Sequence, residues 1–432
     1  MEIPEFSLAQ TAPSPTLADL VRRQAMQYPA APALLLADQT YNYAELVTAI
    51  AEQAGRIPDC GIHRVCGKNL ELAWGAYAAS WRNLPFFPVD RDIGPLADAP
   101  LPPDSALLIT TSGSEGQPKQ VVLGNRQLLA AAHAANQRLP LGPGDLWLAC
   151  LPLHHIGGQS ILWRTAAAGA SVLLHPDFSM PRVVAALQQH PVTHLSLVPA
   201  MLAKLLAADC RPPASLRHVI IGGAALAPAL YQRGSTLGWP LRPSYGMSET
   251  AAQIATWTPA DGPWQPGLAG RPLAGSEIAI GDDGRIRIRS PQLMLGYLGH
   301  SRETSGIDAA GWLTSGDLGH LDAAGCLFIT GRADDMLISG GRNIHPQEIE
   351  ACLAGFPGVL DIAVTGLPDA VWGDRIVALI VGDADETQLL DHARRRLPGA
   401  ALPRRLLRVN RLPRNAAGKL NRAALRALAA SQ

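Results

Sequence analysis

The sequence has no net charge and few charged residues. Its 36 Lys and Arg residues balance 36 Asp and Glu residues, and charged residues make up only 17% of the chain. No overall electrostatic field is therefore available to recruit nucleic acid or an anionic membrane. Hydrophobic residues account for 47% of the chain, which excludes an intrinsically disordered protein. We expect a globular protein whose partner is a small molecule, with no nucleic acid and no membrane.

The sequence also lacks paired cysteines and long apolar runs. None of its 6 cysteines belongs to a Cys-x-x-Cys pair or has metal-ligand spacing, so we expect reduced thiols, as in a cytosolic protein. No uncharged apolar run reaches the ~18 residues that a membrane-spanning helix needs. The first residues, MEIPEFSLAQTAPSP, carry neither a basic segment nor an apolar one. These absences predict a cytoplasmic protein.

The length of the chain predicts more than one domain. Single domains rarely exceed about 250–300 residues, and this chain has 432. Strand-like segments alternate with helical ones as far as Pro272, which favours largely parallel sheets covered on both faces. Beyond it, segments such as SEIAIGDDGRIRIRS alternate strictly, as in a small antiparallel β region. We predict an α/β fold with a large N-terminal domain, residues 1–332, of mainly parallel sheets flanked by helices plus a small β region, followed by a small α+β C-terminal domain, residues 333–432.

A polar loop, TTSGSEGQPK at residues 110–119, follows the apolar segment ALLI. The backbone N–H groups of a glycine- and serine-rich turn can converge on an anion, and hydroxyl groups and a lysine add donors. A Walker A loop is excluded, because Gly113 and Gly116 lie three residues apart and Lys119 is followed by Gln120. By itself the stretch predicts either a phosphate-binding loop or a mobile surface turn.

Four further segments decide between these alternatives. They are YGMSET at 245–250, SGDLG at 315–319, GRADDMLISGGRNIHPQEIE at 331–350 and PRNAAGKLNR at 413–422. In this order, and together with TSGSEGQPK, they resemble the motif set of the adenylate-forming superfamily of acyl-CoA synthetases, adenylation domains and luciferases. The resemblance extends from TYNYAELVTAIAEQAG near the start of the chain to Lys419. It implies an enzyme that activates a carboxylic acid with ATP and Mg²⁺ and passes the acyl group to a thiol, most simply that of coenzyme A.

The resemblance also implies which residues bind the nucleotide. The polar loop would close over the β- and γ-phosphates, the turn IIGGAAL at 220–226 would leave room for the adenine, and a carboxylate would accept both ribose hydroxyls. The residues so assigned are Thr111, Ser112, Gly113, Ser114, Gly116 and Lys119 in the loop, Gly222, Gly223 and Ala224 in the turn, Tyr245, Gly246 and Ser248 in YGMSET, and Asp317 and Arg332 at the ribose. Glu249 would bind Mg²⁺, which prefers oxygen ligands. Glu115 departs from the family pattern, because many members have Ser or Thr there.

The C-terminal domain is implied to be a mobile lid that turns about a hinge at Asp334 between two half-reactions. In the first, Lys419 would bridge the substrate carboxylate and the α-phosphate, because a cation lowers the repulsion between two anions. In the second, Gly340 and Gly341 would line the passage of a slim phosphopantetheine arm, since they carry no side chain. The catalytic residues implied by the resemblance are Lys419, His155 and Glu249.

The segment LPLHHIGGQSILWR at 151–164 carries the histidine motif of the family. His155 stands in the position that borders the acyl pocket, and Gly246 is implied to line the same pocket. The full stretch resembles o-succinylbenzoate-CoA ligases, in which Arg164 would bind a second substrate carboxylate. However, only about twenty residues separate FFPVD from the polar loop, and GIHRVCGKN lacks the spacing of the family's usual strand. Other aryl or medium-chain acyl acids therefore stay open.

The thiol acceptor has two alternatives. The stretch ARRRLPGAALPRRLLRVNRLPRN is dense in arginine, so it could bind the 3′-phosphate of coenzyme A or dock an acidic acyl carrier protein. A stand-alone enzyme that loads a carrier protein is thus the alternative activity. A regulator that has lost catalysis is disfavoured, because the five residues Lys119, Glu249, Asp317, Arg332 and Lys419 are all present. An oligomer is possible.

Overall fold

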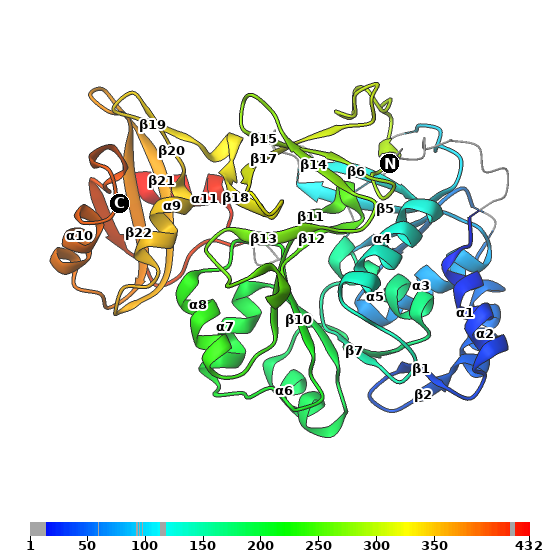
Figure 1. The fold of residues 1–432 in the computed structure, drawn as a ribbon. Helices are drawn as coiled ribbons and strands as arrows, with labels where there is room; N and C mark the ends of the chain where they lie inside the picture. Colours follow the sequence, from blue (N-terminus) through cyan, green and yellow to red (C-terminus); the bar gives the residue numbers. More distant parts are fainter. Residues whose placement is uncertain are drawn as a thin grey trace.

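The computed structural model describes residues 14–58, 60–91, 94, 96, 98–112, 118–414 and 420–432. Figure 1 shows a large part, which contains the chain up to about residue 332, and a smaller C-terminal part coloured orange to red. The large part holds a 13-stranded and a 5-stranded sheet, and the smaller part holds a second 5-stranded sheet. Within the described residues, no helix is both long and apolar enough to span a bilayer.

The 13-stranded sheet is parallel in its centre and antiparallel towards both ends. β11 to β1 run parallel, and the strands that follow β11 in the chain extend the sheet by antiparallel pairing. In spatial order its strands are β14 (Glu277–Ile280), β15 (Arg285–Arg289), β17 (Leu313–Leu321), β18 (Leu327–Arg332), β13 (Leu268–Pro272), β12 (Ala252–Thr256), β11 (Leu241–Met247), β10 (His218–Ile221), β9 (His194–Leu197), β7 (Leu146–Ala149), β8 (Ser171–Leu174), β1 (Pro32–Leu35) and β2 (Thr40–Asn42).

The second sheet of the large part carries the polar loop. β5 and β6 form an antiparallel hairpin, β4 and β3 continue the sheet in parallel beyond β5, and β16 pairs with the other edge of β6. In spatial order the strands are β16 (Gly296–Tyr297), β6 (Pro118–Gly124), β5 (Ser105–Ser112), β4 (Phe86–Val89) and β3 (His63–Cys66). β3 forms within GIHRVCGKN by parallel pairing with β4, although the spacing of this segment departs from that of the family's usual strand.

Helices cover both sheets, and local sequence fixes several of their ends. Thr16 and Asn42 each form a capping box, with Asp19 and Glu45 respectively, at the start of α1 and α2. α5 ends at Gly169, which has a φ of 69°. The helices of the large part are α1 (Leu17–Gln27), α2 (Tyr43–Ala54), α3 (Asn69–Trp81), α4 (Asn125–Arg138), α5 (Ile156–Ala168), α6 (Met180–Gln189), α7 (Pro199–Ala207) and α8 (Pro228–Thr236), with short 3₁₀ turns η1 (Ser248–Thr250) and η2 (Pro259–Asp261).

The C-terminal part is a small α+β unit. β22 lies at its centre and pairs with β21, β19 and β23, while β20 closes a hairpin with β19. Its elements are η3 (Ala333–Asp335), β19 (Leu337–Ser339), β20 (Arg342–Ile344), α9 (Pro346–Leu353), β21 (Val359–Asp369), β22 (Gly373–Gly382), α10 (Glu386–Arg394), η4 (Gly399–Ala401), β23 (Arg405–Arg408) and α11 (Arg422–Ser431).

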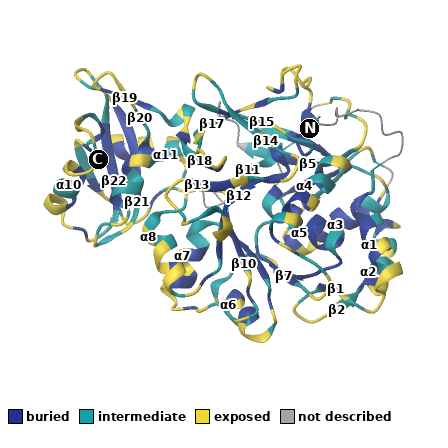
Figure 2. Ribbon diagram, in the orientation of Figure 1, coloured by how far each residue is buried: buried dark blue, intermediate teal, exposed yellow. Residues whose placement is uncertain are grey.

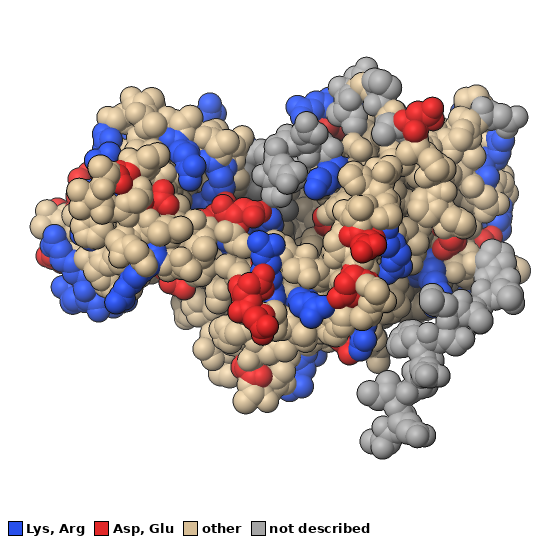
Figure 3. Space-filling view, turned by 90° about the horizontal axis from the view of Figure 1, so that it is seen from above, with Lys and Arg blue, Asp and Glu red and all other residues tan. Residues whose placement is uncertain are grey.

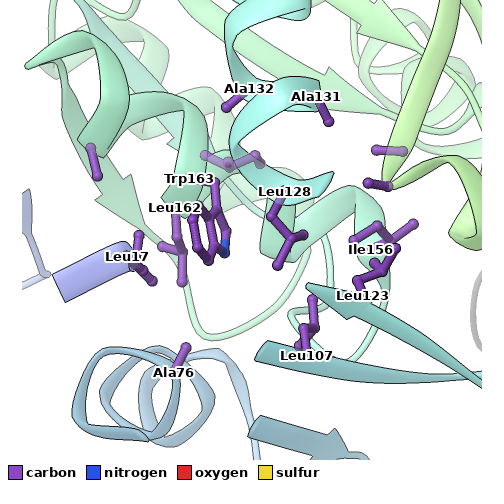
Figure 4. Close-up of a cluster of buried hydrophobic side chains, with 14 of the residues drawn as sticks. Leu17, Ala76, Leu107, Leu123, Leu128, Ala131, Ala132, Ile156, Leu162 and Trp163 are labelled. Carbon is purple, nitrogen blue, oxygen red and sulfur yellow. The ribbon is translucent and has the colours of Figure 1, made fainter. Parts of the chain in front are cut away.

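The main core joins the two large sheets. Side chains of both sheets and of α1 to α5 form one buried cluster, and Figure 4 shows Leu128 of α4, Leu107 of β5 and Trp163 of α5 within it. Alternate residues of β7 point to opposite faces: Trp147 joins this cluster, whereas Leu148 joins a second one with α6 and α7. The central strands are therefore buried on both sides, as Figure 2 shows.

The predicted α/β class is confirmed, with one correction. The sheets are mixed rather than mainly parallel, because the small β region predicted after Pro272 does not stand apart but continues the large sheet through β12 and β13. The predicted boundary falls between β18, which ends at Arg332, and η3, which begins at Ala333. The division of the chain into two domains at this point stays a prediction.

Candidate functional site

The glycine turn predicted to receive an adenine follows the carboxyl end of β10, beside β11. Ligands of α/β sheets commonly bind outside the carboxyl ends of the parallel strands. Gly223 has a φ of 78°, and Gly223 and Ala224 are exposed. A Cβ atom on Gly222 would lie 3.0 Å from the Ser244 hydroxyl, one residue before Tyr245 on the neighbouring strand. The turn is thus an exposed, side-chain-poor surface next to Tyr245.

Three residues predicted to bind the nucleoside lie in one hydrogen-bonded chain. The Tyr245 hydroxyl donates to Asp317 Oδ2 at 2.8 Å, and Arg332 Nη1 donates to Asp317 Oδ1 at 3.2 Å. Asp317 and Arg332 are paired across β17 and β18, and a Cβ atom on Gly316 would lie only 2.7 Å from Arg332 Nη2. Burial and the neighbouring Asp317 raise the pKa of Tyr245 well above its usual value, so this phenol stays a donor.

The same series of hydrogen bonds continues to the predicted hinge residue, Asp334. Arg332 Nη2 donates to Asp334 Oδ2 at 3.2 Å, so one guanidinium contacts both the predicted ribose carboxylate and the predicted pivot. Asp335, the last residue of η3, is held from the C-terminal part: Arg422 Nε donates to Asp335 Oδ2 at 3.1 Å. Arg422 Nη1 also donates to Glu350 Oε1 at 2.8 Å. The short segment between the two parts is therefore held by an arginine from each side.

The motif YGMSET turns sharply after β11. A side chain on Gly246 would collide with the backbone carbonyl of Ala252, so only glycine fits there. Ala251 and Ala252 have φ values of 49° and 95°, a region that side-chain-bearing residues rarely adopt. The buried hydroxyl of Thr250 donates within this turn, with the carbonyls of Met247 and Ala252 as its acceptors. Strained backbone of this kind often belongs to functional sites, and here it presents Ser248 and Glu249.

Glu249 and Lys119 meet at a residue that the sequence motifs did not single out. The Tyr297 hydroxyl donates to Glu249 Oε1 at 2.8 Å, and Lys119 Nζ lies 5.4 Å from the centre of the Tyr297 ring. Burial and the Glu249 carboxylate raise the pKa of Tyr297, so it donates rather than accepts. The phosphate-loop lysine and the predicted metal ligand, far apart in sequence, therefore flank one phenol.

The donor set fits Mg²⁺ bound together with phosphates. Among the described residues, no group of three or more His, Cys, Asp and Glu side chains could hold a metal ion by itself. Mg²⁺ usually takes one or two carboxylates, with substrate phosphates and waters completing its coordination. Glu249 is a partly exposed carboxylate of this kind, and Lys119 lies beside the ring of the tyrosine that donates to it.

Part of the predicted phosphate and catalytic machinery lies outside the described residues. Thr111 and Lys119 are paired at the end of the β5–β6 hairpin, and the Thr111 hydroxyl donates to the Lys119 carbonyl at 3.4 Å. The hairpin thus holds both ends of the polar loop. Gly113, Ser114, Gly116 and Lys419 are not among the described residues, nor is the side chain of Ser112.

Two of the three residues predicted to contact the acid, His155 and Arg164, lie at the start of α5 and within it, at different depths. His155 immediately precedes the helix, and its ring centre lies 4.2 Å from that of His154. Arg164 is only 3% exposed, and its guanidinium carbon lies 5.6 Å from the centre of the Trp147 ring. Its Nε has no hydrogen-bond partner among the described residues, and burial lowers its pKa to about 10. The structure therefore brings Arg164 to Trp147 and not to the nucleotide residues.

Gly340 and Gly341 form the exposed turn between β19 and β20. Their φ values are 57° and 73°, as the tight turn of a two-residue hairpin requires. Gly340 packs against Trp372, whose ring a Cβ atom would approach to 3.3 Å. Both glycines are thus on the surface of the C-terminal part, where the sequence predicts a passage for a thiol arm.

Two family models and a series of known proteins match this chain. The family model described as AMP-binding enzyme matches residues 68–298, and that described as AMP-binding enzyme C-terminal domain matches residues 348–419. The 2-succinylbenzoate–CoA ligase of Bacillus pumilus is 38% identical over 331 residues, which are 74% of this chain and 68% of that protein. The ligase of the same name from Bacillus subtilis is 37% identical over 331 residues, again 74% and 68%.

Solved structures resemble the whole chain. The o-succinylbenzoate CoA synthetase of Bacillus subtilis, in complex with its acyl-adenylate intermediate, has a TM-score of 0.83 and 28% identity, covering 96% of this chain and 98% of that one. The same enzyme in complex with ATP and magnesium ion has a TM-score of 0.81 and 29% identity, covering 94% and 98%. Motifs, fold and relatives agree, and this chain belongs to the family of AMP-binding enzymes.

Proposed function

We propose that this protein is an AMP-forming ligase that activates a carboxylic acid with ATP and transfers the acyl group to coenzyme A. The observation that carries the proposal is the pair of clusters described above. One joins Tyr245, Asp317 and Arg332, and the other joins Glu249 and Lys119 through Tyr297. The similarity to 2-succinylbenzoate–CoA ligases over 74% of the chain supports it.

The reaction has two half-reactions. First, a carboxylate oxygen of the acid forms a bond to the α-phosphorus of ATP, and pyrophosphate leaves with the electron pair of the bond between that phosphorus and the bridging oxygen. Then the sulfur of the thiol, having lost its proton to solvent, forms a bond to the acyl carbon, and AMP leaves with the electron pair of the acyl–oxygen bond. Activation thus replaces a poor leaving group by a good one.

The residues of this chain would bind and orient the reactants. Asp317 would accept the ribose hydroxyls, and Lys119 would bind the terminal phosphates. Lys419 would lower the repulsion between carboxylate and α-phosphate, which makes it an electrostatic catalyst. A Mg²⁺ ion held by Glu249 would neutralise part of the triphosphate charge. Asp334 would act as the hinge about which the C-terminal domain turns. Lys419 would face the reactants in the first half-reaction, and the Gly340–Gly341 turn would face them in the second.

The acid that we propose is a dicarboxylate such as 2-succinylbenzoate. The support is twofold: relatives bear that name, and Arg164 is a buried guanidinium whose Nε lacks a partner among the described residues. A carboxylate would supply that acceptor. At 1.5 Å per residue, Arg164 lies roughly 13 Å along α5 from His155, so the acid must extend past His155 to reach it. Aryl and medium-chain acyl monoacids are the alternative.

Transfer to a carrier protein is the second candidate for the thiol step. Residues 394–411 contain seven arginines: Arg394, Arg395, Arg396, Arg404, Arg405, Arg408 and Arg411. Figure 3 shows Lys and Arg side chains gathered over parts of the C-terminal unit, at the left of that view. Such a surface favours an anionic partner, which is either the 3′-phosphate of coenzyme A or an acidic carrier protein.

An acid panel tests the proposal. We expect ATP- and Mg²⁺-dependent pyrophosphate release with 2-succinylbenzoate or another aryl or acyl acid, and an acyl thioester when coenzyme A is added. Lys119→Ala should abolish pyrophosphate release, whereas Lys68→Ala, which removes an exposed lysine near Asp177, should not. Absence of release with every acid, together with no ATP binding by calorimetry, would contradict the proposal. A thioester formed only with carrier protein would select the second candidate.

A further inference from the structure

Tyr297 lies beside Lys119 because of strand pairing. β16 is antiparallel to β6, with Tyr297 opposite Val121. Residues opposite one another in a sheet project from the same face, and so do residues two apart on one strand. Lys119 is two residues before Val121, so its side chain stands diagonally beside the phenol, and the ammonium lies 5.4 Å from the ring centre. This distance is within the range of an attractive cation–π contact.

Tyr297 also holds Glu249, and by a separate contact. Its hydroxyl donates to Glu249 Oε1 at 2.8 Å, which fixes the side chain and leaves Oε2 for another partner. The backbone of Glu249 is fixed as well, because the Met294 amide donates to its carbonyl at 2.8 Å. Both ends of Glu249 are therefore tied to the segment from Met294 to Tyr297.

The position of the phenol is itself defined. The Tyr297 amide donates to the Ser305 hydroxyl at 2.9 Å, and that hydroxyl donates to the Ser301 carbonyl at 2.7 Å. Tyr297 is thus anchored at two points, through its backbone amide and through its hydroxyl. A side chain held in this way can set the distance between two charged groups that belong to different sheets.

We propose that Tyr297 is a positioning residue that holds the Glu249 carboxylate and the Lys119 ammonium at a fixed separation, ready for a magnesium–triphosphate. The inference rests on the proposed function, because it is ATP that Lys119, and Glu249 through Mg²⁺, would bind. Partners that hydrogen-bond to a metal-binding side chain commonly change metal affinity or activity by about 10- to 100-fold when removed. The hydroxyl should therefore affect binding of the metal by Glu249, and the ring should affect binding of the phosphates by Lys119.

Calorimetry with α,β-methylene-ATP separates these two roles, because the analogue cannot release pyrophosphate. In the wild type, we expect tighter binding with magnesium chloride than with EDTA. The magnesium gain is the ratio of the affinity with magnesium chloride to the affinity with EDTA. Tyr297→Phe keeps the ring and loses the hydroxyl, so the magnesium gain should fall about tenfold while the affinity in EDTA stays unchanged. Tyr297→Leu should lose the magnesium gain and, in addition, roughly two- to fivefold of the affinity in EDTA, as for a lost cation–π contact.

Tyr43→Phe is the matched control. The Tyr43 hydroxyl is buried and donates to the Ala170 carbonyl at 2.8 Å, far along the chain from the site. Its removal should lower the melting temperature and leave the magnesium gain as in the wild type. A Tyr297→Phe protein with the full magnesium gain, or with equal losses in magnesium and EDTA, would overturn the positioning role. A wild type that binds the analogue in neither condition would overturn the proposed function, and the positioning role with it.

Discussion

Replacing Asp317 by asparagine tests the ribose site with little change of shape. The carboxylate now accepts from the Tyr245 hydroxyl at 2.8 Å and from Arg332 at 3.2 Å. Asparagine can still accept from Tyr245, but its NH₂ group would face the Arg332 guanidinium, donor against donor. The variant therefore loses the ion pair and one of the two acceptor oxygens that a ribose with two hydroxyls would use.

The structure predicts a small cost in stability and a large cost in ATP affinity. The Arg332 side chain is 44% exposed and that of Asp317 is 16% exposed, so their ion pair is close to solvent. Such pairs contribute at most about 1 kcal/mol to folding. Hydrogen bonds from a ligand to a charged acceptor are worth about 1.5–3 kcal/mol, which corresponds to a loss of about 10- to 150-fold in affinity for ATP.

The assay is calorimetric binding of α,β-methylene-ATP and of its 2′-deoxy and 3′-deoxy forms. The wild type should bind both deoxy forms more weakly, whereas Asp317→Asn should bind all three alike, because the group that distinguishes them has changed. Asp391→Asn is the control: this carboxylate is 48% exposed and pairs with Arg394 within α10 of the C-terminal part. Asp317→Asn binding the three analogues with the wild-type ranking would refute the ribose assignment.

Three further substitutions test the lid and the acid site. Lys419→Ala should slow adenylation by about 10² to 10³ yet spare thioester formation from a pre-made acyl-adenylate; equal losses in both steps would argue for misfolding. Asp334→Pro should leave pyrophosphate release intact and slow AMP release on addition of thiol, because proline fixes φ at the hinge; wild-type rates in both would contradict the boundary at 332–334. Arg164→Leu should lower kcat/KM for a diacid by about one to two decades, since charge-assisted hydrogen bonds are worth about 1.5–3 kcal/mol, and should spare a matched monoacid; a shared loss would show that Arg164 only supports the core.

The site residues that could be predicted are those that lie in short, recognisable sequence motifs. The polar loop was recognisable because glycines, hydroxyls and Lys119 follow one another, and Thr111 and Lys119 do lie at the mouth of one hairpin. Asp317 and Arg332 were assigned separately by resemblance, and the antiparallel pairing of β17 and β18 places them opposite each other. In these cases, the residues that act together are near in sequence or lie in recognisable motifs.

What the sequence could not predict depends on contacts between distant segments. Tyr297 became visible only through the pairing of β16 with β6, since a tyrosine after glycine in LGYLG has no pattern that indicates a partner. The burial of Arg164 depends on which face of α5 packs against Trp147, and that orientation is set by tertiary packing rather than by the sequence of the helix. The continuation of the large sheet beyond β13 likewise follows from a long-range pairing, that of β13 with β18, which strand propensity does not predict.

Acid-dependent exchange of labelled pyrophosphate into ATP, in the absence of any thiol, tests adenylate formation most directly. Reversible formation of an acyl-adenylate requires this exchange, and it isolates the first half-reaction from the choice between coenzyme A and a carrier protein. Pyrophosphate exchange should require Mg²⁺ and a carboxylic acid, and it should be lost in Lys119→Ala. Binding of ATP without exchange for any aryl, acyl or dicarboxylic acid, or exchange that proceeds equally well with no acid, would contradict adenylate formation.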